Sequence, residues 1–280
     1  MISIIIPSYN HGNNVESLLK SIFAQSYENY QIIIIDGGST DSTNSVIQKF
    51  LSSIYYYNSE KDNGIFEAMN KGIAKATGDW LYFIGCDDCM YNKDVLSAIF
   101  ATRQYTNEKV IAGKIFNLKL NKILGQAITA KADLLHQQIW HQSVFYHRDV
   151  FSSAGIYATK YTVSSDSIFN RMLFCNYDFK WIFLDVIVAK YSGTGASSLV
   201  FDREYHNDQK TLYFEWFNDV PRSAVYDGLQ YHMYNEFRHG NILAGAKEII
   251  SIIWHTKSLS PYIYNALFWF KERISEKFRA

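Results

Sequence analysis

The stretch that decides the fold is SIIIPSYN, Ser3 to Asn10. A continuous apolar run of strand length is typical of a strand buried on both faces of a helix-covered parallel sheet. Proline cannot donate to a sheet ladder, so we expect strand pairing to end at Pro7. Ligands of such sheets bind beyond the carboxyl ends of the strands, which makes residues 7–10 a candidate site. A buried strand followed by an ordinary loop fits the same residues.

The chain beyond this stretch alternates between helical and strand patterns. Leu18, Leu19 and Ile22 recur at helical spacing, and the four isoleucines at 32–35 lead into Asp36. This alternation predicts right-handed βαβ units, and therefore an α/β, Rossmann-like fold with a mainly parallel central sheet.

The pattern continues as far as residue 100. A strand is expected at 54–57, followed by a helix with Ile65, Met69 and Ile73 on one face and Gly78 as its C-cap. A strand at 80–84 then runs into Asp87 and Asp88. The next helix carries Val95, Leu96 and Ile99. Strands at 110–116 and 181–188 follow with mixed patterning between them, residues 192–198 read as a flexible loop, and the chain from about 203 is expected to be helical.

Composition narrows the class of protein. Lys plus Arg equals Asp plus Glu at 27 each among 280 residues, so no global positive charge indicates nucleic acid as a partner. Three cysteines and no charged-then-apolar leader favour a cytoplasmic location. No stretch approaches the roughly 18 consecutive apolar residues that span a bilayer.

Carboxylates follow two of the predicted strands. Asp36 and the pair Asp87-Asp88 should open on the same sheet edge as Tyr9. Adjacent carboxylates repel, and a divalent cation relieves this repulsion, so the pair suits Mg²⁺ or Mn²⁺ held jointly by protein and a substrate phosphate. A solvated turn is the alternative for Asp87-Asp88.

Three other chemistries fit the sequence poorly. Cys86-Asp87-Asp88-Cys89 is formally a C-x-x-C, but no second pair exists for zinc and the helix start of a redox motif is missing. The glycines at 193 and 195 do not complete a dinucleotide fingerprint, and no G-K-[ST] is present for a P-loop.

The quoted motifs carry a family resemblance. SIIIPSYNHGNNVESLLKSIFAQSYENYQIIIIDGGSTDST (3–43) and KDNGIFEAMNKGIAKATGDWLYFIGCDD (61–88) resemble the nucleotide-sugar half of the family-2 inverting glycosyltransferases with the A-type fold, as found in bacterial surface-polysaccharide synthesis. A weaker likeness extends through His141-Gln142 and Ser164-Ser165-Asp166 to about residue 200. The resemblance implies a nucleotide-sugar-binding half at 1–100 and an acceptor-binding half at 101–202. The sequence pattern adds a helical C-terminal extension at 203–280.

The resemblance also implies roles for individual residues. Those matched to nucleotide-sugar binding are Pro7, Tyr9 (against uracil), Asp36 (accepting from the base imino N–H), Asp62, Asp87 (ribose or donor sugar) and Asp88. Asp88 matches the metal ligand for Mn²⁺ or Mg²⁺ at the diphosphate. Cys86 stands where the strict D-x-D pattern has its first aspartate, which leaves the division of work between Asp87 and Asp88 open.

Asp166 matches the family's catalytic base, which takes the proton of the acceptor hydroxyl as that hydroxyl attacks the anomeric carbon. It could also be the N-cap of the helix that carries Ile168 and Leu173. His141 and Arg171 match acceptor-side positions, although a lone histidine is more often structural.

The expected activity is therefore metal-dependent inverting transfer of one hexosyl or N-acetylhexosaminyl group from a UDP-sugar. The acceptor would be a glycan or a polyprenyl-diphosphate-linked oligosaccharide in O-antigen or capsule biosynthesis. The aromatic and basic residues of 260–280 suit peripheral contact with the inner face of the plasma membrane, and they equally suit a helix packed on its own domain. A nucleotidyltransferase and a non-catalytic nucleotide-sugar-binding relative are the alternatives.

Overall fold

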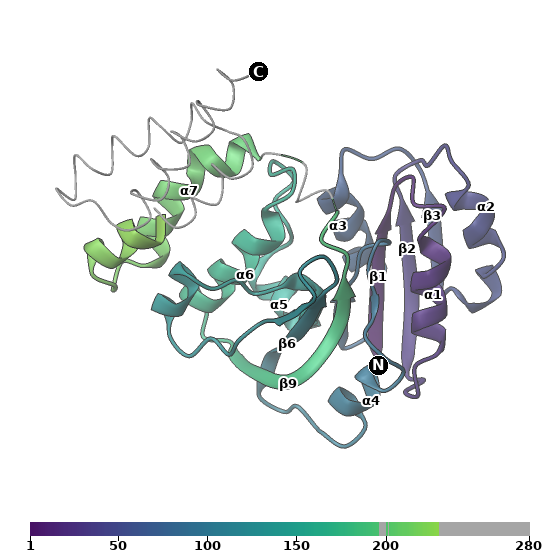
Figure 1. Ribbon diagram of the computed structural model, residues 1–280, viewed down its shortest axis with the longest axis horizontal. Coiled ribbons are helices and arrows are strands. Elements are labelled where there is room, and N and C mark those ends of the chain that lie inside the picture. The colour runs from purple at the N-terminus through teal and green to yellow at the C-terminus, as the bar shows by residue number, and fades with distance from the viewer. Residues whose placement is uncertain (196–199, 201, 230–280) are drawn as a thin grey trace. The chain divides into compact units, whose positions relative to one another are not determined.

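The computed structural model describes residues 1–195, 200 and 202–229 (Figure 1). The chain divides into two compact units, residues 1–127 with 138–207, and residues 128–137 with 208–280. All the predicted site residues lie in the first unit, so the fold is described for that unit. The division of the chain at residues 100 and 202 stays a prediction.

The first four strands are parallel, as predicted. They are β1 (Ile2–Ser8), β2 (Tyr30–Asp36), β3 (Tyr56–Ser59) and β4 (Trp80–Phe83). Their order in the sheet is β3-β2-β1-β4, and the register pairs Ser8 with Asp36. The ends of β1 and β2 therefore meet at the same sheet edge.

Pairing on the β2 side does not stop at Pro7 but continues to Ser8, so that prediction was wrong by one residue. The Pro7 carbonyl accepts a hydrogen bond from the Cys86 thiol, which lies after β4. A strand residue directs its carbonyl and its nitrogen to the same side. The missing N–H of Pro7 therefore faces the side where the β1–β4 ladder has already ended, at Ile5 and Phe83.

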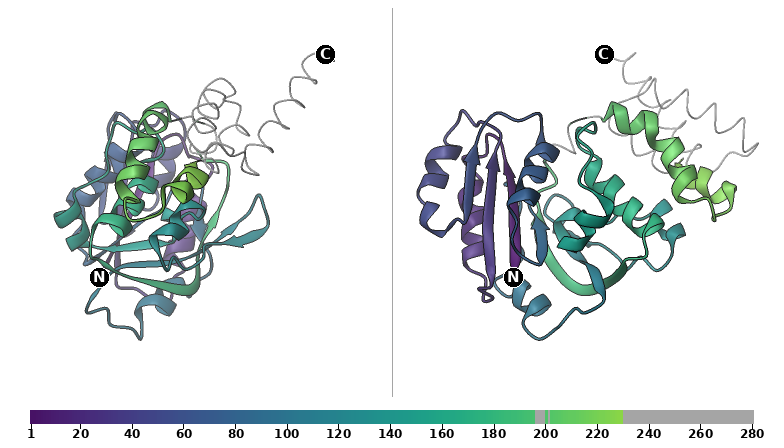
Figure 2. Two further views of the ribbon diagram at one scale, coloured as in Figure 1. Left: turned by 90° about the vertical axis from the view of Figure 1, so that its left-hand side faces the viewer. Right: turned by 180° about the vertical axis from the view of Figure 1, so that it is seen from behind.

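Helices cover both faces of these strands (Figures 1 and 2). The helices among the described residues include α1 (Val15–Phe23), α2 (Thr43–Gln48), α3 (Ile65–Lys75), α4 (Val95–Phe100), α5 (Arg148–Ala154), α6 (Ser165–Asn176) and α7 (Arg203–Trp216), with short 3₁₀ turns η1 (Leu51–Ser53), η2 (Lys131–Leu135) and η3 (His141–Ser143). Ile4 and Ile6 belong to the same core cluster as the apolar face of α1, whereas α3 packs against β1 and β2 from the opposite face. This two-sided burial explains why both strands read as continuous isoleucine runs.

Three local predictions need correction. Strand β3 begins at Tyr56 and not at Ile54. Helix α3 buries Phe66, Met69 and Gly72, while Ile65 is exposed, so its buried stripe is displaced by one residue from the predicted one. The C-cap of α3 is Ala76, not Gly78.

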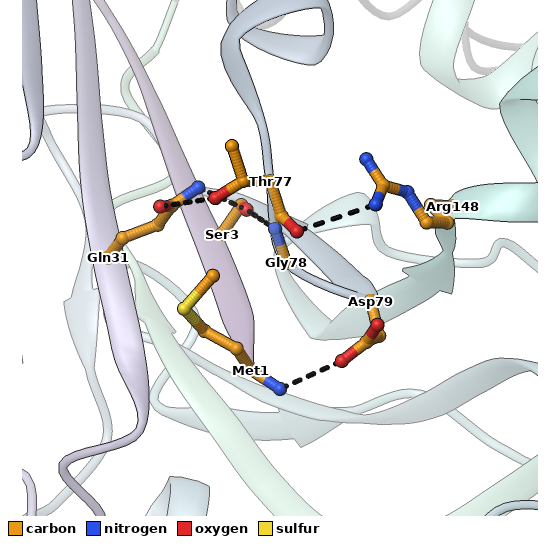
Figure 3. A network of polar contacts seen from close by, with 7 residues as sticks. All are labelled: Met1, Ser3, Gln31, Thr77, Gly78, Asp79 and Arg148. Carbon is orange, nitrogen blue, oxygen red and sulfur yellow. Dashed lines mark hydrogen bonds and ion pairs between the residues drawn. The ribbon is translucent and has the colours of Figure 1, made fainter.

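Gly78 has a different reason to be glycine (Figure 3). A Cβ there would come within 2.8 Å of the Met1 carbonyl and of Ser3 Oγ. The Gly78 N–H donates to Ser3 Oγ, which also accepts from Gln31 Nε2, while Thr77 Oγ1 donates to Gln31 Oε1. This network satisfies the two polar side chains buried at the start of β1 and β2.

The strands after residue 84 make the sheet mixed. They are β5 (Cys89–Met90), β6 (Glu108–Asn117), β7 (Lys122–Leu124), β8 (Val144–His147) and β9 (Lys180–Tyr191). The path continues β4-β8-β6-β9-β5, with β7 paired to β6, and only β6–β9 is parallel among these added pairs. The end of β9 is thereby brought to the loop after β4.

The predicted helical character after residue 203 is confirmed for α7. The predicted membrane-contact segment 260–280 lies outside the described residues. In the part of the chain that is described, no helix combines the length and apolar character needed to cross a bilayer.

Candidate active site

The loops after β1 and β2 are joined by hydrogen bonds between backbone and side chains. The Asn10 N–H donates to Ser39 Oγ at 2.7 Å, and the Thr40 N–H donates to Asn10 Oδ1 at 2.9 Å. Asn10 adopts φ 56°, in the left-handed region that asparagine tolerates. Tyr9, one residue earlier, is 59% exposed. The loop thus leaves a tyrosine ring available at the predicted ligand edge.

Asp36 is fully buried at the end of β2. Its Oδ2 accepts hydrogen bonds from the Ser39 N–H and the Ser59 hydroxyl, and its Oδ1 accepts one from the Ser39 hydroxyl. A carboxylate has about four acceptor positions, so the protein itself uses most of them. In this structure Asp36 organises the loop around it, and its role toward a nucleotide stays a prediction.

Asp62 reaches the same edge from the loop after β3. A Cβ on Gly37 would lie 2.8 Å from Asp62 Oδ2, so only a glycine at 37 leaves room for this carboxylate. The Gly64 N–H donates to Asp62 Oδ1. Burial, which outweighs that hydrogen bond, raises the pKa of Asp62. The structure therefore places Asp62 beside Gly37, the residue after Asp36, while its nucleotide-binding role stays a prediction.

Asp87 and Asp88 are held from the far end of the sheet by Ser192, the residue after β9. Ser192 Oγ donates to Asp87 Oδ2 at 2.7 Å, and the Ser192 N–H donates to Asp88 Oδ1 at 2.9 Å. A Cβ on Gly195 would lie 2.8 Å from Asp87 Oδ2. Ser192 and Gly195 therefore lie against the acidic pair, whereas residues 196–198 of the predicted flexible loop lie outside the described residues. No sequence motif marks Ser192, because its role depends on β9 pairing with β5.

Asp88 is the more buried of the two acids. Burial, and then the charge of Asp87, raises the pKa of Asp88 to about 7. The Ser192 N–H and the Gln142 side chain favour its charged form without offsetting these effects. The pair is accordingly not a freely solvated turn but a site that holds more negative charge than its surroundings neutralise.

The cysteines that flank this pair are free thiols. Burial raises the pKa of Cys86 to about 12, and Cys89 is also shifted upward by burial. A protonated, buried thiol is a poor nucleophile and a poor metal ligand. The Cys86-x-x-Cys89 motif is thus structural.

The turn η3 joins the acidic pair to Asp166. His141 Nδ1 lies 2.6 Å from Asp166 Oδ2, and the side chain of the next residue, Gln142, favours the charged form of Asp88 and so lowers its pKa. The Tyr82 hydroxyl of β4 donates to the Gln142 carbonyl, which ties the turn to the sheet. Two groups that lie 78 residues apart in sequence are therefore linked through adjacent side chains.

The pKa of His141 is set by burial on one side and by nearby carboxylates on the other. Burial opposes its protonation, but the carboxylate of Asp166, followed by those of Asp88 and Asp87, outweighs burial and raises the pKa of His141. The imidazole is thus held toward the form that donates from Nδ1 to Asp166.

Asp166 lies in the first turn of α6, but it is not the helix N-cap. That position is Ser164, and the N–H groups of Val163 and Ser164 both donate to Asp202. Asp166 is left to contact His141. Arg171 is buried on the same helix, where its guanidinium hydrogen-bonds to Ser167 one turn earlier. Its acceptor-side role stays a prediction.

The residues present fit a divalent cation completed by other ligands. Within the described residues, no group of three or more His, Cys, Asp and Glu side chains is arranged to hold a metal ion. Asp87 and Asp88 supply hard oxygen donors, and the raised pKa of Asp88 shows charge that a cation would neutralise. Such a site would need phosphate oxygens to complete it.

The fold is similar to those of solved glycosyltransferases. It matches S. aureus TarS 1–349 in complex with UDP-GlcNAc with a TM-score of 0.65 and 16% identity, covering 95% of this chain and 79% of that one. It matches the mannosyltransferase PcManGT from Pyrobaculum calidifontis, in complex with GDP-Man and Mn2+, with a TM-score of 0.55 and 15% identity, covering 98% and 80%. The protein has the A-type glycosyltransferase fold, as the sequence predicted.

Sequence relatives give the family. Residues 3–128 match the family described as "Glycosyl transferase family 2". The chain is 32% identical over 210 residues to a PGL/p-HBAD biosynthesis glycosyltransferase of Mycobacterium tuberculosis, which covers 73% of this chain and 82% of that protein. The chain belongs to glycosyltransferase family 2, and the nucleotidyltransferase alternative is set aside.

Proposed function

We propose that this glycosyltransferase transfers a single hexose or N-acetylhexosamine from a UDP-sugar to a hydroxyl of a glycan or polyprenyl-diphosphate-linked acceptor, with inversion. The observation that carries the proposal is the turn η3, where His141 contacts Asp166 and also feels the charges of Asp88 and Asp87. A reaction of this type needs a base for the acceptor and a charged site for the donor diphosphate. The turn η3 lies between candidates for both.

On the donor side, the exposed ring of Tyr9 suits stacking on uracil. Pro7 is buried near the end of the strand that presents it, and Asp36 and Asp62 lie at the neighbouring strand ends. Asp87, the more exposed of the acidic pair, suits a contact with ribose or sugar hydroxyls. The likeness to TarS, whose structure holds UDP-GlcNAc, supports a uridine donor.

Asp88, with Asp87 beside it, would hold Mg²⁺ or Mn²⁺. When bound, such an ion supplies charge stabilisation to the departing diphosphate. The acids themselves serve an additional purpose, because their hydrogen bonds to Ser192 fix the loop after β9 at the donor side.

Asp166 is proposed as the base. Its Oδ2 is engaged by His141, which leaves Oδ1 to take the proton of the acceptor hydroxyl. The oxygen of that hydroxyl bonds to the anomeric carbon while the bond from this carbon to the diphosphate breaks, and UDP leaves. A carboxylate held by one imidazole is oriented for this proton transfer.

The acceptor class is the least constrained part of the proposal. The mycobacterial relative is named for PGL/p-HBAD biosynthesis, which supports a lipid or glycan acceptor, and a role in O-antigen or capsule assembly at the inner membrane face fits the same chemistry. Arg171 is the acceptor-side residue that we propose beside His141.

The deciding experiment measures binding and turnover separately. Purified protein is screened against UDP- and GDP-sugars for thermal stabilisation with and without Mn²⁺, since a ligand of the native state raises apparent stability. The best donor is then assayed for UDP release with lipid-linked acceptors. Stabilisation by a GDP-sugar alone would contradict the uridine assignment. Donor binding with no turnover on any acceptor would favour the non-catalytic alternative.

A further inference from the structure

The hairpin between β6 and β7 exposes a patch of large apolar side chains. Leu118, Leu120 and Ile123 are 51%, 55% and 53% exposed, and every residue from 118 to 123 is exposed. Single apolar residues are common on protein surfaces, but three within six residues at one turn form a local patch. We call residues 118–123 the hairpin tip.

The hairpin tip has a defined conformation. Phe116 pairs with Ile123 across the hairpin, and the Leu118 N–H donates to the Tyr191 carbonyl at 2.9 Å. The Leu120 N–H donates to Asn117 Oδ1 at 2.9 Å, and Asn121 adopts φ 49°, which asparagine tolerates better than a branched residue. The exposed leucines are therefore presented by an ordered turn.

The charge of the hairpin tip has one sign. Lys119 and Lys122 alternate with the apolar residues, and no Asp or Glu occurs from 109 to 132. The neighbouring Lys114 is paired with Asp185, whereas the described residues contain no acidic partner for Lys119 or Lys122. Leucines that enter the acyl boundary beside lysines that reach anionic headgroups are the pattern of an interfacial segment.

The hairpin tip also adjoins the loop that holds the acidic pair. A Cβ on Gly193 would lie 3.1 Å from Lys119 Cβ, and Ser192, next to Gly193, hydrogen-bonds to both Asp87 and Asp88. A surface that contacts the hairpin tip would therefore lie next to the donor side of the candidate active site.

We propose that the hairpin tip docks on the surface of an anionic lipid bilayer. The apolar residues insert at the headgroup boundary and the two lysines contact lipid phosphates. The bilayer contact itself does not depend on the proposed reaction; only its purpose, bringing the site to a lipid-linked acceptor, rests on the proposed function.

The test is co-sedimentation of the full chain, without donor or acceptor, with vesicles of phosphatidylglycerol and phosphatidylcholine or of phosphatidylcholine alone. Lys119→Glu/Lys122→Glu should weaken binding to anionic vesicles at least about twentyfold, since each basic residue near such a surface strengthens binding roughly fivefold. Leu118→Ser/Leu120→Ser/Ile123→Ser should weaken it at least about tenfold. Lys49→Glu and Leu51→Ser change one exposed lysine and one exposed leucine elsewhere and should leave binding unchanged.

Several results would overturn the proposal. Equal binding of wild type and both hairpin variants would assign the membrane contact to another segment, and no binding by wild type would exclude it. A dimeric wild type that becomes monomeric in the leucine variant would identify the hairpin tip as an interface between copies. Circular dichroism checks that each variant folds. If the leucine variant misfolds, the binding of the lysine variant alone tests the proposal, because both lysines are exposed and their replacement should not disturb the fold. Absence of sugar transfer would not affect the outcome.

Discussion

His141 Nδ1 lies 2.6 Å from Asp166 Oδ2, which couples the turn η3 to the first turn of helix α6. The contact is a charge-assisted hydrogen bond, because the imidazole carries the proton and the carboxylate accepts it. Such bonds are about twice as strong as neutral ones. The pair therefore serves both to stabilise the fold and to orient the proposed base.

Replacement of the base tests the proposed mechanism directly. We expect Asp166→Asn to lower kcat by about 10² to 10⁴, because the amide cannot accept the acceptor proton. Calorimetric affinity for the donor should stay within about twofold, since Asp166 is proposed to act on the acceptor. Unchanged turnover would show that another group is the base.

His141 should affect turnover through orientation. His141→Ala removes the contact with Asp166 and should lower kcat about tenfold or more, with a smaller change in donor KM. His141→Asn keeps a side-chain N–H close to the Nδ1 position and should recover part of the loss. If both variants match wild type, the contact has no part in catalysis.

The same contact makes stability depend on pH. The folded pKa of His141 is raised, so its contribution is fully present below the unfolded value of about 6.5 and is lost as pH rises through the folded value. Wild type should exceed His141→Ala in unfolding free energy by about 1–3 kcal/mol at pH 6. By urea denaturation, this difference should shrink at pH 9; a difference that grows with pH would contradict the prediction.

We expect Asp88 to lower the stability of the ligand-free protein and to contribute to binding of the donor with its cation. Asp88→Asn removes a buried charge next to Asp87 and should raise unfolding free energy by at least about 1 kcal/mol without ligand. The same variant should lose the Mn²⁺-dependent part of its thermal stabilisation by the donor. Asp185→Asn, which changes an exposed carboxylate, is the control and should show neither effect.

Ser192 should set the position of the acidic pair. Ser192→Ala removes the hydroxyl bond to Asp87 but keeps the backbone bond to Asp88. We expect a stability loss of about 0.5–1.5 kcal/mol and a rise of roughly threefold to tenfold in donor KM. Ser45→Ala, on α2, is a matched control for the loss of one hydroxyl bond and should not change KM. A rise in both variants would indicate a general effect on folding.

The sequence determined much of this protein by local pattern. Strand length and continuous isoleucines are sufficient to predict β1 and β2 as buried parallel strands, since each run must be covered on both faces. The positions of Asp36 and the Asp87-Asp88 pair after their strands likewise predicted that both open on the same sheet edge as Tyr9. The buried face of α3 lies one residue away from the predicted face. The reason is that this face is set by the close packing of Gly72 against Ile5 and not by the largest side chains.

Only the tertiary structure decided how the second half completes the site. Ser192 meets Asp87 and Asp88 because β9 pairs with β5, and His141 meets Asp166 because η3 is tied to β4 through the Tyr82 hydroxyl. These contacts join residues 25 to more than 100 positions apart, so no local periodicity encodes them. SIIIPSYN fixed the edge of the sheet where chemistry is possible. The partners that meet at that edge follow from long-range strand pairing and from the need to satisfy buried polar groups.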